Sequence, residues 1–347
     1  MTKEWFVVDC HNQYIPREAI SLIMSSPMGK QMMGFGGGGS ATAGPMSGSL
    51  DMEQKLKVMD EAGVDMAVIH MASLNLLGLE FCAAMNNGNA RVAREYPGKI
   101  VPLAHVPLET DPAVMKELDR AINDMGLRGV ALETSSDKYT LGSPELTPLF
   151  EKINSLGVPV VIHPGNFRML DGGSPASVMD AMNNINMATM VEQENARAAT
   201  ELLGGVLPKF PELKVLLPHH GGGMPQLLGR MMFHFLPEGF VLPDKYKTTI
   251  PRTRKIREEL GLDEKFMELF GRMYFDTAGF MGWMPITQAT LLTVKPQRMV
   301  FGTDYGLEMI EAEDIKAFID DIKALPIAEA DRKAILGDTA RELFKIQ

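Results

Sequence analysis

The sequence predicts an α/β protein, more specifically a (β/α)8 TIM barrel with a long loop after the first strand. Three observations lead to this fold class: eight short apolar segments, helical patterns between them, and histidine or aspartate near the ends of most of these segments. The chain has 347 residues, enough for one barrel with insertions, since such barrels typically need about 250. We therefore expect a single barrel domain over residues 1–347.

The apolar segments are continuous hydrophobic runs rather than alternating patterns. Continuous runs are typical of parallel strands that are buried on both faces. The predicted strands are, in chain order, 5–9, 66–71, 100–105, 128–132, 159–163, 214–218, 272–276 and 298–302. An open doubly wound sheet has the same alternation of strands and helices, but a count of eight favours the closed barrel.

Helical patterns occupy the intervals between the predicted strands. One begins at Asp111, with proline at the next position, a combination that caps a helix and fits its first turn. Another follows Ser143 in the same way and stops before Gly157, as expected of a glycine that ends a helix. The helices expected from these signals and from apolar spacing are 111–125, 144–156, 190–207 and 327–345.

Two segments lack a regular pattern. Residues 24–50 contain four consecutive glycines and little that would form a helix or a strand. Loops of this length are uncommon in compact domains and are often active-site lids, so we interpret 24–50 as a lid over the barrel mouth. Residues 237–255 form a second irregular connection.

The composition excludes several classes of partner. Acidic residues outnumber basic residues by 44 to 34, which gives a formal net charge of −10. Nucleic acids and anionic membrane surfaces require a basic patch, and no apolar run approaches the roughly 18–20 residues of a transmembrane helix. We therefore expect a small-molecule substrate. Two cysteines, Cys10 and Cys82, cannot form a disulfide framework, which favours a cytoplasmic location.

Six of the seven histidines lie at or just beyond the ends of predicted strands, where the active site of a barrel forms. These six are His11, His70, His105, His163, His219 and His220. Asp304 follows the last strand and adds a carboxylate to this set. Imidazole plus carboxylate suits Zn²⁺, Mn²⁺ or Fe²⁺, so we interpret His11, His163 and His219 with this carboxylate as a metal site.

Five motifs resemble those of one family and occur in the same order. They are Asp9-Cys10-His11, His163-Pro164, His219-His220-Gly221-Gly222 with Pro225, Tyr274-Phe275-Asp276, and Gly302-Thr303-Asp304-Tyr305. The tail 335–344 agrees as well. On these residues the chain resembles the amidohydrolase superfamily, in the branch of aminocarboxymuconate-semialdehyde decarboxylase that is often named amidohydrolase 2. The resemblance covers nearly the whole chain and implies a metal-binding TIM barrel.

The resemblance also implies a role for each matching residue. His11, His163 and Asp304 would bind one divalent ion, with Zn²⁺ as the first expectation and Mn²⁺ or Fe²⁺ as alternatives. His219 would be the catalytic acid or base near the metal, or a metal ligand as in some members of the family, and it is preferred to its neighbour His220. Asp304 would also contribute to catalysis.

One position departs from the family pattern. The family usually has His-x-His after the first strand, whereas this chain has His11-Asn12-Gln13. Glutamine offers only a neutral carbonyl oxygen, a weaker ligand than imidazole for a divalent transition metal. Three interpretations stay open: Gln13 is a weak metal ligand, it bonds to a metal-bound water or to the substrate, or the metal is lost and the site works with little or none.

Further residues are expected to contact the substrate. Arg230 matches an arginine that, in family decarboxylases, reaches a neighbouring subunit's site and holds a substrate carboxylate, which implies a homodimer or a larger homo-oligomer. The residues expected to bind substrate are Gln13, His70, His105, His220, Met28 and Met32. Taken singly, His70 and His105 are more simply explained as core histidines. Methionines are adaptable contacts for aromatic rings, although ordinary packing explains them equally well.

The leading functional hypothesis is a metal-dependent, non-oxidative decarboxylase of a small aromatic or unsaturated carboxylic acid. The ion would stabilise negative charge as CO₂ leaves, and His219 would deliver a proton to the carbon that loses CO₂. The first alternative is a metal-dependent hydrolase or hydratase acting on a lactone, an amide or a C–C bond, because the same ion can activate water and the fold does not choose between them. The second alternative is a metal-free or non-catalytic binding barrel.

Overall fold

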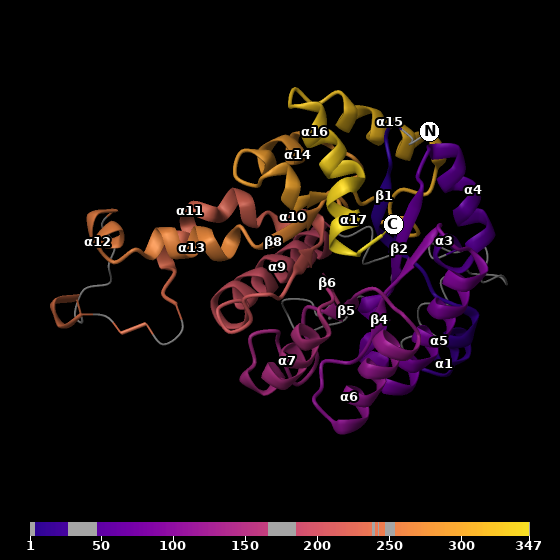
Figure 1. The fold of residues 1–347 in the computed structure, drawn as a ribbon, viewed down its shortest axis with the longest axis horizontal. Coiled ribbons are helices and arrows are strands. Elements are labelled where there is room, and N and C mark those ends of the chain that lie inside the picture. Colours follow the sequence, from indigo (N-terminus) through magenta and orange to yellow (C-terminus); the bar gives the residue numbers. More distant parts are fainter. Residues whose placement is uncertain are drawn as a thin grey trace.

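The structure is a computed structural model that describes residues 4–26, 47–165, 185–237, 240–241, 243–246 and 254–346. Within these ranges the strands are parallel and are surrounded by helices (Figure 1). The strands are β1 (Val8–Gln13), β2 (Met66–His70), β3 (Ile100–Pro102), β4 (Ala104–His105), β5 (Val130–Glu133), β6 (Val160–His163), β7 (Val215–Leu217), β8 (Met273–Asp276) and β9 (Met299–Val300).

β3 and β4 together form one of the strands of the barrel wall. β3 pairs with β2 and β4 pairs with β5, so the predicted strand 100–105 changes partners midway. The ring closes because the amide of Cys10 donates to the carbonyl of Phe301 (2.8 Å) and the amide of Gln13 donates to that of Tyr305 (2.9 Å). With β3 and β4 counted as one, the described strands form a closed barrel of eight, and the predicted (β/α)8 barrel is confirmed.

The first strand lies further along the chain than predicted. The expectation of 5–9 is wrong, because β1 runs over Val8–Gln13. The apolar side chains of Trp5 and Phe6 are only partly buried and pack against the edge of the core. The strand instead continues through polar residues that are fully enclosed by the barrel. A hydrophobicity pattern therefore misplaces a strand whose buried residues are polar.

The predicted helices are present with small changes at their ends. The first three become α6 with a π turn at Arg120–Asp124, a short 3-10 turn with α7, and α9 with a π turn at Leu202–Val206. The C-terminal one is divided into α16, a π turn and α17. The α-helices are α1 (Arg17–Ser25), α3 (Ser47–Leu50), α4 (Met52–Ala62), α5 (Leu79–Glu95), α6 (Pro112–Asp119), α7 (Thr147–Leu156), α9 (Ile185–Glu201), α10 (His219–Gly222), α11 (Met224–His234), α12 (Arg254–Glu259), α13 (Leu262–Phe270), α14 (Met284–Leu291), α15 (Ala312–Lys323), α16 (Glu329–Lys333) and α17 (Thr339–Leu343).

The two predicted irregular segments are described only in part. Of the predicted lid, residues 24–25 belong to α1 and 47–50 form α3, while 27–46 lie outside the described residues. In the second segment a 3-10 turn covers Asp244–Tyr246, and α12 begins at Arg254. α12 lies at one side of the molecule, at the left of Figure 1.

Apolar side chains fill the amino-terminal half of the barrel interior. Val8, Val68 and Leu216 contribute to this inner core, and Leu343 and Phe344 close it from below. A larger apolar layer packs the strands against the surrounding helices. Because the lower interior is filled with hydrocarbon, the buried polar side chains are confined to the carboxyl ends of the strands, which positions the candidate site there. Among the helices of the described ranges, none has the length and hydropathy required to cross a membrane.

Candidate active site

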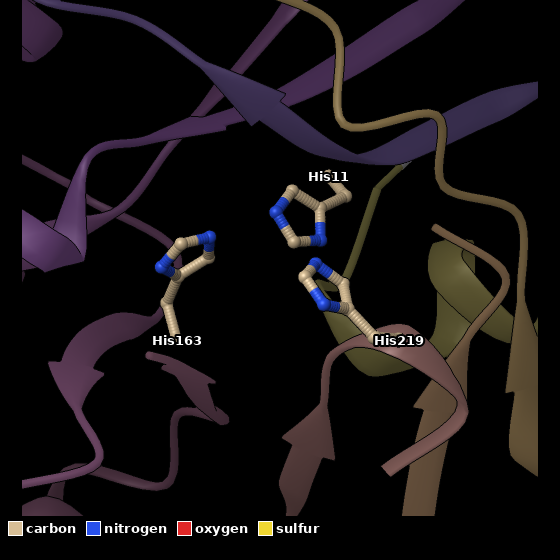
Figure 2. A group of neighbouring side chains, drawn as sticks. All are labelled: His11, His163 and His219. Atoms are coloured by element: carbon tan, nitrogen blue, oxygen red, sulfur yellow. The ribbon is translucent and has the colours of Figure 1, made fainter. Parts of the chain in front are cut away.

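Three histidine rings meet at the carboxyl ends of β1, β6 and β7. The ring of His11 lies 5.0 Å from that of His163 and 5.3 Å from that of His219, measured between centroids. One nitrogen from each ring lies within 4.8 Å of the others, and the rings converge on one space (Figure 2). The structure therefore brings together three histidines that are distant in the sequence.

Each of these rings is held from behind by a hydrogen bond at Nδ1. His11 bonds to Oδ2 of Asp276, and His163 bonds to the carbonyl of Pro164, both at 2.8 Å. The acceptor for His219 is Oε1 of Glu192, also at 2.8 Å. Since Nδ1 is occupied in every ring, Nε2 is the atom left facing the cluster. Bonds of this kind orient the histidine ligands of metal sites.

Asp304 adds a carboxylate to the same space. Its Oδ1 lies 3.3 Å from Nε2 of His11, and its Oδ2 lies 4.0 Å from Nε2 of His219. Burial alone would raise the pKa of Asp304, but the charges on His11 and His219 lower it below the usual value. The carboxylate is therefore ionised, as a metal ligand must be.

Gln13 reaches into the middle of this group from β1. Its Nε2 lies 2.8 Å from Nε2 of His163, 3.0 Å from Oδ1 of Asp304 and 3.2 Å from Nε2 of His11. Its Oε1 is buried and has no hydrogen-bond partner among the described residues. The imidazole nitrogens and the carboxylate fit a divalent metal ion, and the Gln13 amide lies among them with its nitrogen, not its oxygen, turned toward them.

A left-handed turn separates His219 from its neighbour. Both His219 and His220 have φ of 53°, and the next three residues, all glycines, are left-handed as well. This conformation costs a non-glycine residue about 1–2 kcal/mol, and such strain is often found at functional sites. The turn points His219 into the cluster, while His220 bonds to Oγ1 of Thr290 (3.0 Å) and packs against Phe280.

The histidines of the cluster have very different proton affinities. Burial lowers the pKa of His219, but Glu192, Asp304 and Asp276 outweigh it and raise that pKa to about 10. Burial dominates at His163 and lowers its pKa to about 3. The cluster therefore combines a proton-holding imidazole with a neutral, ligand-ready one.

Polar groups without hydrogen-bond partners lie next to the cluster, at the ends of β2 and β4. His70, at the end of β2, is fully buried, and its ring lies 5.1 Å from that of His11. Neither of its nitrogens has a partner among the described residues, and neither does Nε2 of His105. Nδ1 of His105 bonds to Oδ1 of Asn75 at 2.8 Å. Burial lowers the pKa of His70 well below its ordinary value and that of His105 to about 3.

The geometry can be compared with known proteins. The family model described as amidohydrolase matches residues 8–346. This chain belongs to the amidohydrolase family. The resemblance to the amidohydrolase 2 branch is therefore confirmed.

Individual relatives cover most of this amidohydrolase. It is similar to gamma-resorcylate decarboxylase of Polaromonas sp. strain JS666, with 26% identity over 312 residues that cover 85% of this chain and 87% of the relative. It is similar in fold to the crystal structure of 5-carboxyvanillate decarboxylase from Sphingomonas paucimobilis, with a TM-score of 0.74, 17% identity, and coverage of 99% and 100% of the two chains. A second fold relative, dihydroxybenzoic acid decarboxylase from Polaromonas sp. JS666, was solved with manganese and the inhibitor 2-nitroresorcinol (TM-score 0.71, 21% identity, 98% and 97% coverage).

Several sequence-predicted site residues of this amidohydrolase do not join the cluster. Arg230 lies on α11 with its side chain exposed to solvent, so it does not reach the histidines of its own chain. His220 is turned toward α14, as described above. Met28 and Met32 lie outside the described residues.

Sequence reasoning missed two side chains that support the site of this amidohydrolase. Glu192 of α9 orients His219, and no motif marks it. Lys55 of α4 is fully buried, with Nζ 2.6 Å from Oδ1 of Asn12 and 3.2 Å from the carbonyl of Gln13. Burial lowers the pKa of Lys55 to about 7. A signal for Lys55 exists, because it occupies the apolar spacing of α4 between Met52 and Met59.

A half-open cavity of about 560 Å³ lies at the other end of the barrel. Lys214, Tyr274 and Arg298 are among the residues that line it. None of the clustered histidines belongs to its lining, and these residues flank the amino ends of β7, β8 and β9. The cavity is therefore separate from the candidate active site.

Proposed function

We propose that this amidohydrolase is a metal-dependent, non-oxidative decarboxylase of a small aromatic acid that carries a hydroxyl group beside its carboxylate. The observation that carries this proposal is the pairing of a metal-binding set with a separately held imidazole. One nitrogen each of His11, His163 and His219 lie within 4.8 Å of one another, and Oδ1 of Asp304 lies 3.3 Å from Nε2 of His11. Nε2 of His219 has no hydrogen-bond partner among the described residues. Decarboxylation needs both parts, a positive charge for the carboxylate and a proton donor for the carbon.

The residues that would hold the ion are His11, His163, Asp304 and Gln13. A bound divalent ion supplies positive charge that holds the carboxylate and the neighbouring oxygen and stabilises the negative charge that develops in the reaction. Zinc, our first expectation, remains a prediction beside manganese and iron. The manganese in the dihydroxybenzoic acid decarboxylase structure supports including manganese in every test.

His219 serves as the proton donor. Glu192 raises the pKa of this imidazole against the effect of burial and holds the ring by Nδ1, so that Nε2 faces the substrate. The donated proton goes to the ring carbon that bears the carboxylate. The C–C bond then breaks, its electron pair restores the aromatic ring, and CO₂ leaves. Glu192 is 24% exposed, so a proton from solvent can return to His219.

His70 completes the substrate side. Its imidazole is neutral because burial lowers its pKa, so it offers one N–H donor and one acceptor. Both are unsatisfied among the described residues, and leaving them so costs about 1–3 kcal/mol for each group. A substrate hydroxyl or carboxylate oxygen placed between the two sides of the mouth satisfies His70. His105 bonds to Asn75 through Nδ1, and its Nε2 also has no hydrogen-bond partner among the described residues.

The substrate class comes from the relatives. Gamma-resorcylate, dihydroxybenzoic acid and 5-carboxyvanillate name the decarboxylases that this chain resembles. Arg230 is proposed to act in the site of a neighbouring subunit, so this role requires a homo-oligomer. The single domain and the cytoplasmic location also stay predictions.

A panel of acids tests the proposed reaction. The chain, loaded separately with Mn²⁺ and Zn²⁺, is incubated with 2,6-dihydroxybenzoate, 6-methylsalicylate, 5-carboxyvanillate and benzoate, and CO₂ release is measured. We expect release from at least one hydroxylated acid and none from benzoate, which lacks the neighbouring oxygen. Hydrolysis of lactones or amides without CO₂ release from any acid would overturn the proposal in favour of a hydrolase.

A further inference from the structure

We propose that Gln13 is an amide-oxygen ligand that biases the metal site toward manganese relative to zinc, and that its amide group turns over when the ion binds. The inference deepens the proposed metal site, on which it rests, but it does not depend on the reaction catalysed there. It concerns the one position at which the chain departs from the family's His-x-His motif.

The hydrogen bonds around Gln13 do not suit the protonation state in which the site binds an ion. With His11 and His163 neutral, as metal binding requires, the three polar atoms nearest to Nε2 are all acceptors, at 2.8, 3.0 and 3.2 Å. An amide nitrogen has only two hydrogens, so one acceptor is left without a donor. The other end of the same amide, Oε1, is fully buried and has no partner among the described residues.

The spacing of these atoms is that of neighbouring ligands on one ion. Two ligand atoms that each lie about 2.1 Å from a metal, at angles of about 90–109°, are about 3.0–3.4 Å apart. The amide end of Gln13 lies 2.8 Å from His163 Nε2 and 3.0 Å from Asp304 Oδ1, and Asp304 Oδ1 lies 3.3 Å from His11 Nε2. The amide end is therefore close enough to His163 and Asp304 to share one ion with them.

A half-turn about the last side-chain bond would give the buried oxygen a partner, the ion. It places Oε1 where Nε2 lies, so that an acceptor faces the ion together with the other ligands. The backbone does not need to move, because the amide of Gln13 donates to Tyr305 and its carbonyl accepts from Nζ of Lys55. Gly306 also packs close, since a Cβ added there would lie 3.3 Å from Cβ of Gln13. The rotation therefore involves only the side chain of Gln13.

An oxygen ligand from Gln13 changes the ratio of the affinities of the site for manganese and zinc. Imidazole suits zinc, whereas carbonyl and carboxylate oxygens suit manganese. Zinc binds more tightly than manganese to almost any common ligand set, so the effect is on the ratio of the two affinities. A histidine in place of Gln13 would add a nitrogen ligand and widen that ratio, while an anionic oxygen would favour manganese.

The test measures metal binding without substrate. Dissociation constants for Mn²⁺ and Zn²⁺ are determined by competition with a chelating dye for the wild type, Gln13→His, Gln13→Glu and Gln13→Ala, with thermal unfolding as a check of folding. Gln297→His, the same exchange at an exposed position remote from the site, is the control. We expect Gln13→His to raise the ratio Kd(Mn)/Kd(Zn) at least tenfold, Gln13→Glu to tighten manganese, and Gln13→Ala to weaken both ions at least tenfold.

Two results would overturn the inference. Unchanged affinities in Gln13→Ala would show that Gln13 is not a ligand, and an unchanged ratio in Gln13→His would show that it does not bias the choice of ion. Gln13→Glu is almost isosteric and carries the test if the histidine variant does not fold. Because no turnover is measured, failure of the decarboxylase assay leaves this result intact, and the reverse also holds.

Discussion

Two neighbouring groups of histidines at the barrel mouth, named here its two sides, are held in different ways. On the side of β1, β6 and β7, each clustered ring is bonded from behind through Nδ1. On the side of β2 and β4, His70 has no partner at either nitrogen among the described residues and His105 has one. The first side is preorganised to hold an ion, whereas the second is left to be completed by a ligand.

Carboxylates explain the electrostatic part of this difference. Asp276, Asp304 and Glu192 all lie on the first side, where they raise the pKa of His11 and His219 against the effect of burial. Burial acts on His105 without such a carboxylate and lowers its pKa to about 3. Charge is therefore concentrated on the metal side, and the substrate side offers neutral hydrogen-bonding groups.

The largest effect is expected from the metal side. Asp304→Asn replaces an anionic ligand by a neutral one, so we expect the bound ion to be lost and turnover to fall about 10⁴-fold. Elemental analysis and CO₂ release measure the two effects. Asp320→Asn, the same exchange on the exposed face of α15, should change neither. Full metal content in Asp304→Asn would place the ion elsewhere.

The next largest effect is expected at His219, in contrast to its neighbour His220. We expect His219→Asn to lower kcat about 10³-fold, in the range of a lost general acid, while the metal content stays above half of the wild-type value. His220→Asn, one residue further along and turned toward Thr290, should lower kcat less than tenfold. Loss of the ion in His219→Asn would instead make His219 a metal ligand.

A smaller effect is expected on the substrate side. His70→Phe keeps the ring volume and removes both polar nitrogens, so we expect KM to rise about tenfold, equivalent to about 1.4 kcal/mol, with unchanged metal content. Steady-state kinetics on the best acid of the panel provide the measurement. A fall in metal content with unchanged KM would assign His70 to the metal side.

The smallest effect concerns stability in acid. The pKa of His105 is about 3 in the folded chain and 6.5 ordinarily, so below pH 6.5 the unfolded chain takes up a proton that the folded chain refuses. Stability therefore falls as the pH drops from about 6.5 toward 3, by up to about 1.4 kcal/mol per pH unit from this residue. His105→Gln should lose about 2 kcal/mol less than the wild type between pH 7 and pH 5.

Denaturant unfolding at both pH values checks this difference. His234→Gln, a histidine at the exposed end of α11, serves as the control and should behave like the wild type. Equal acid sensitivity in the wild type and in His105→Gln would contradict the assignment of a buried neutral imidazole at this position.

The sequence allowed the barrel and the metal-side residues to be predicted because both depend on where strands end. His11, His163, His219 and Asp304 each follow an apolar run, and parallel strands bring their carboxyl ends together. The polar strand β1 was misplaced because its buried residues are not hydrophobic. Glu192 was missed for a different reason: its contact with His219 depends on how α9 packs against the left-handed turn.

That packing is a tertiary property with no local signal. A Cβ on Gly222 would lie 2.1 Å from the carbonyl of Glu192, so the glycine permits the contact, but a glycine in a sequence does not say which helix approaches it. His70 differs from Glu192, because the sequence indicates its position at a strand end. Its lack of hydrogen-bond partners, however, is visible only in the structure.

The most direct test of the division between the two sides is a crystal structure of the manganese-loaded chain with 2-nitroresorcinol, the inhibitor seen in the dihydroxybenzoic acid decarboxylase structure. We expect anomalous density for the ion about 2.2 Å from His11, His163 and Asp304, an inhibitor oxygen within hydrogen-bond distance of His70, and Nε2 of His219 facing the inhibitor ring. An ion bound through His70 or His105, or an inhibitor that contacts neither His70 nor His219, would contradict this expectation.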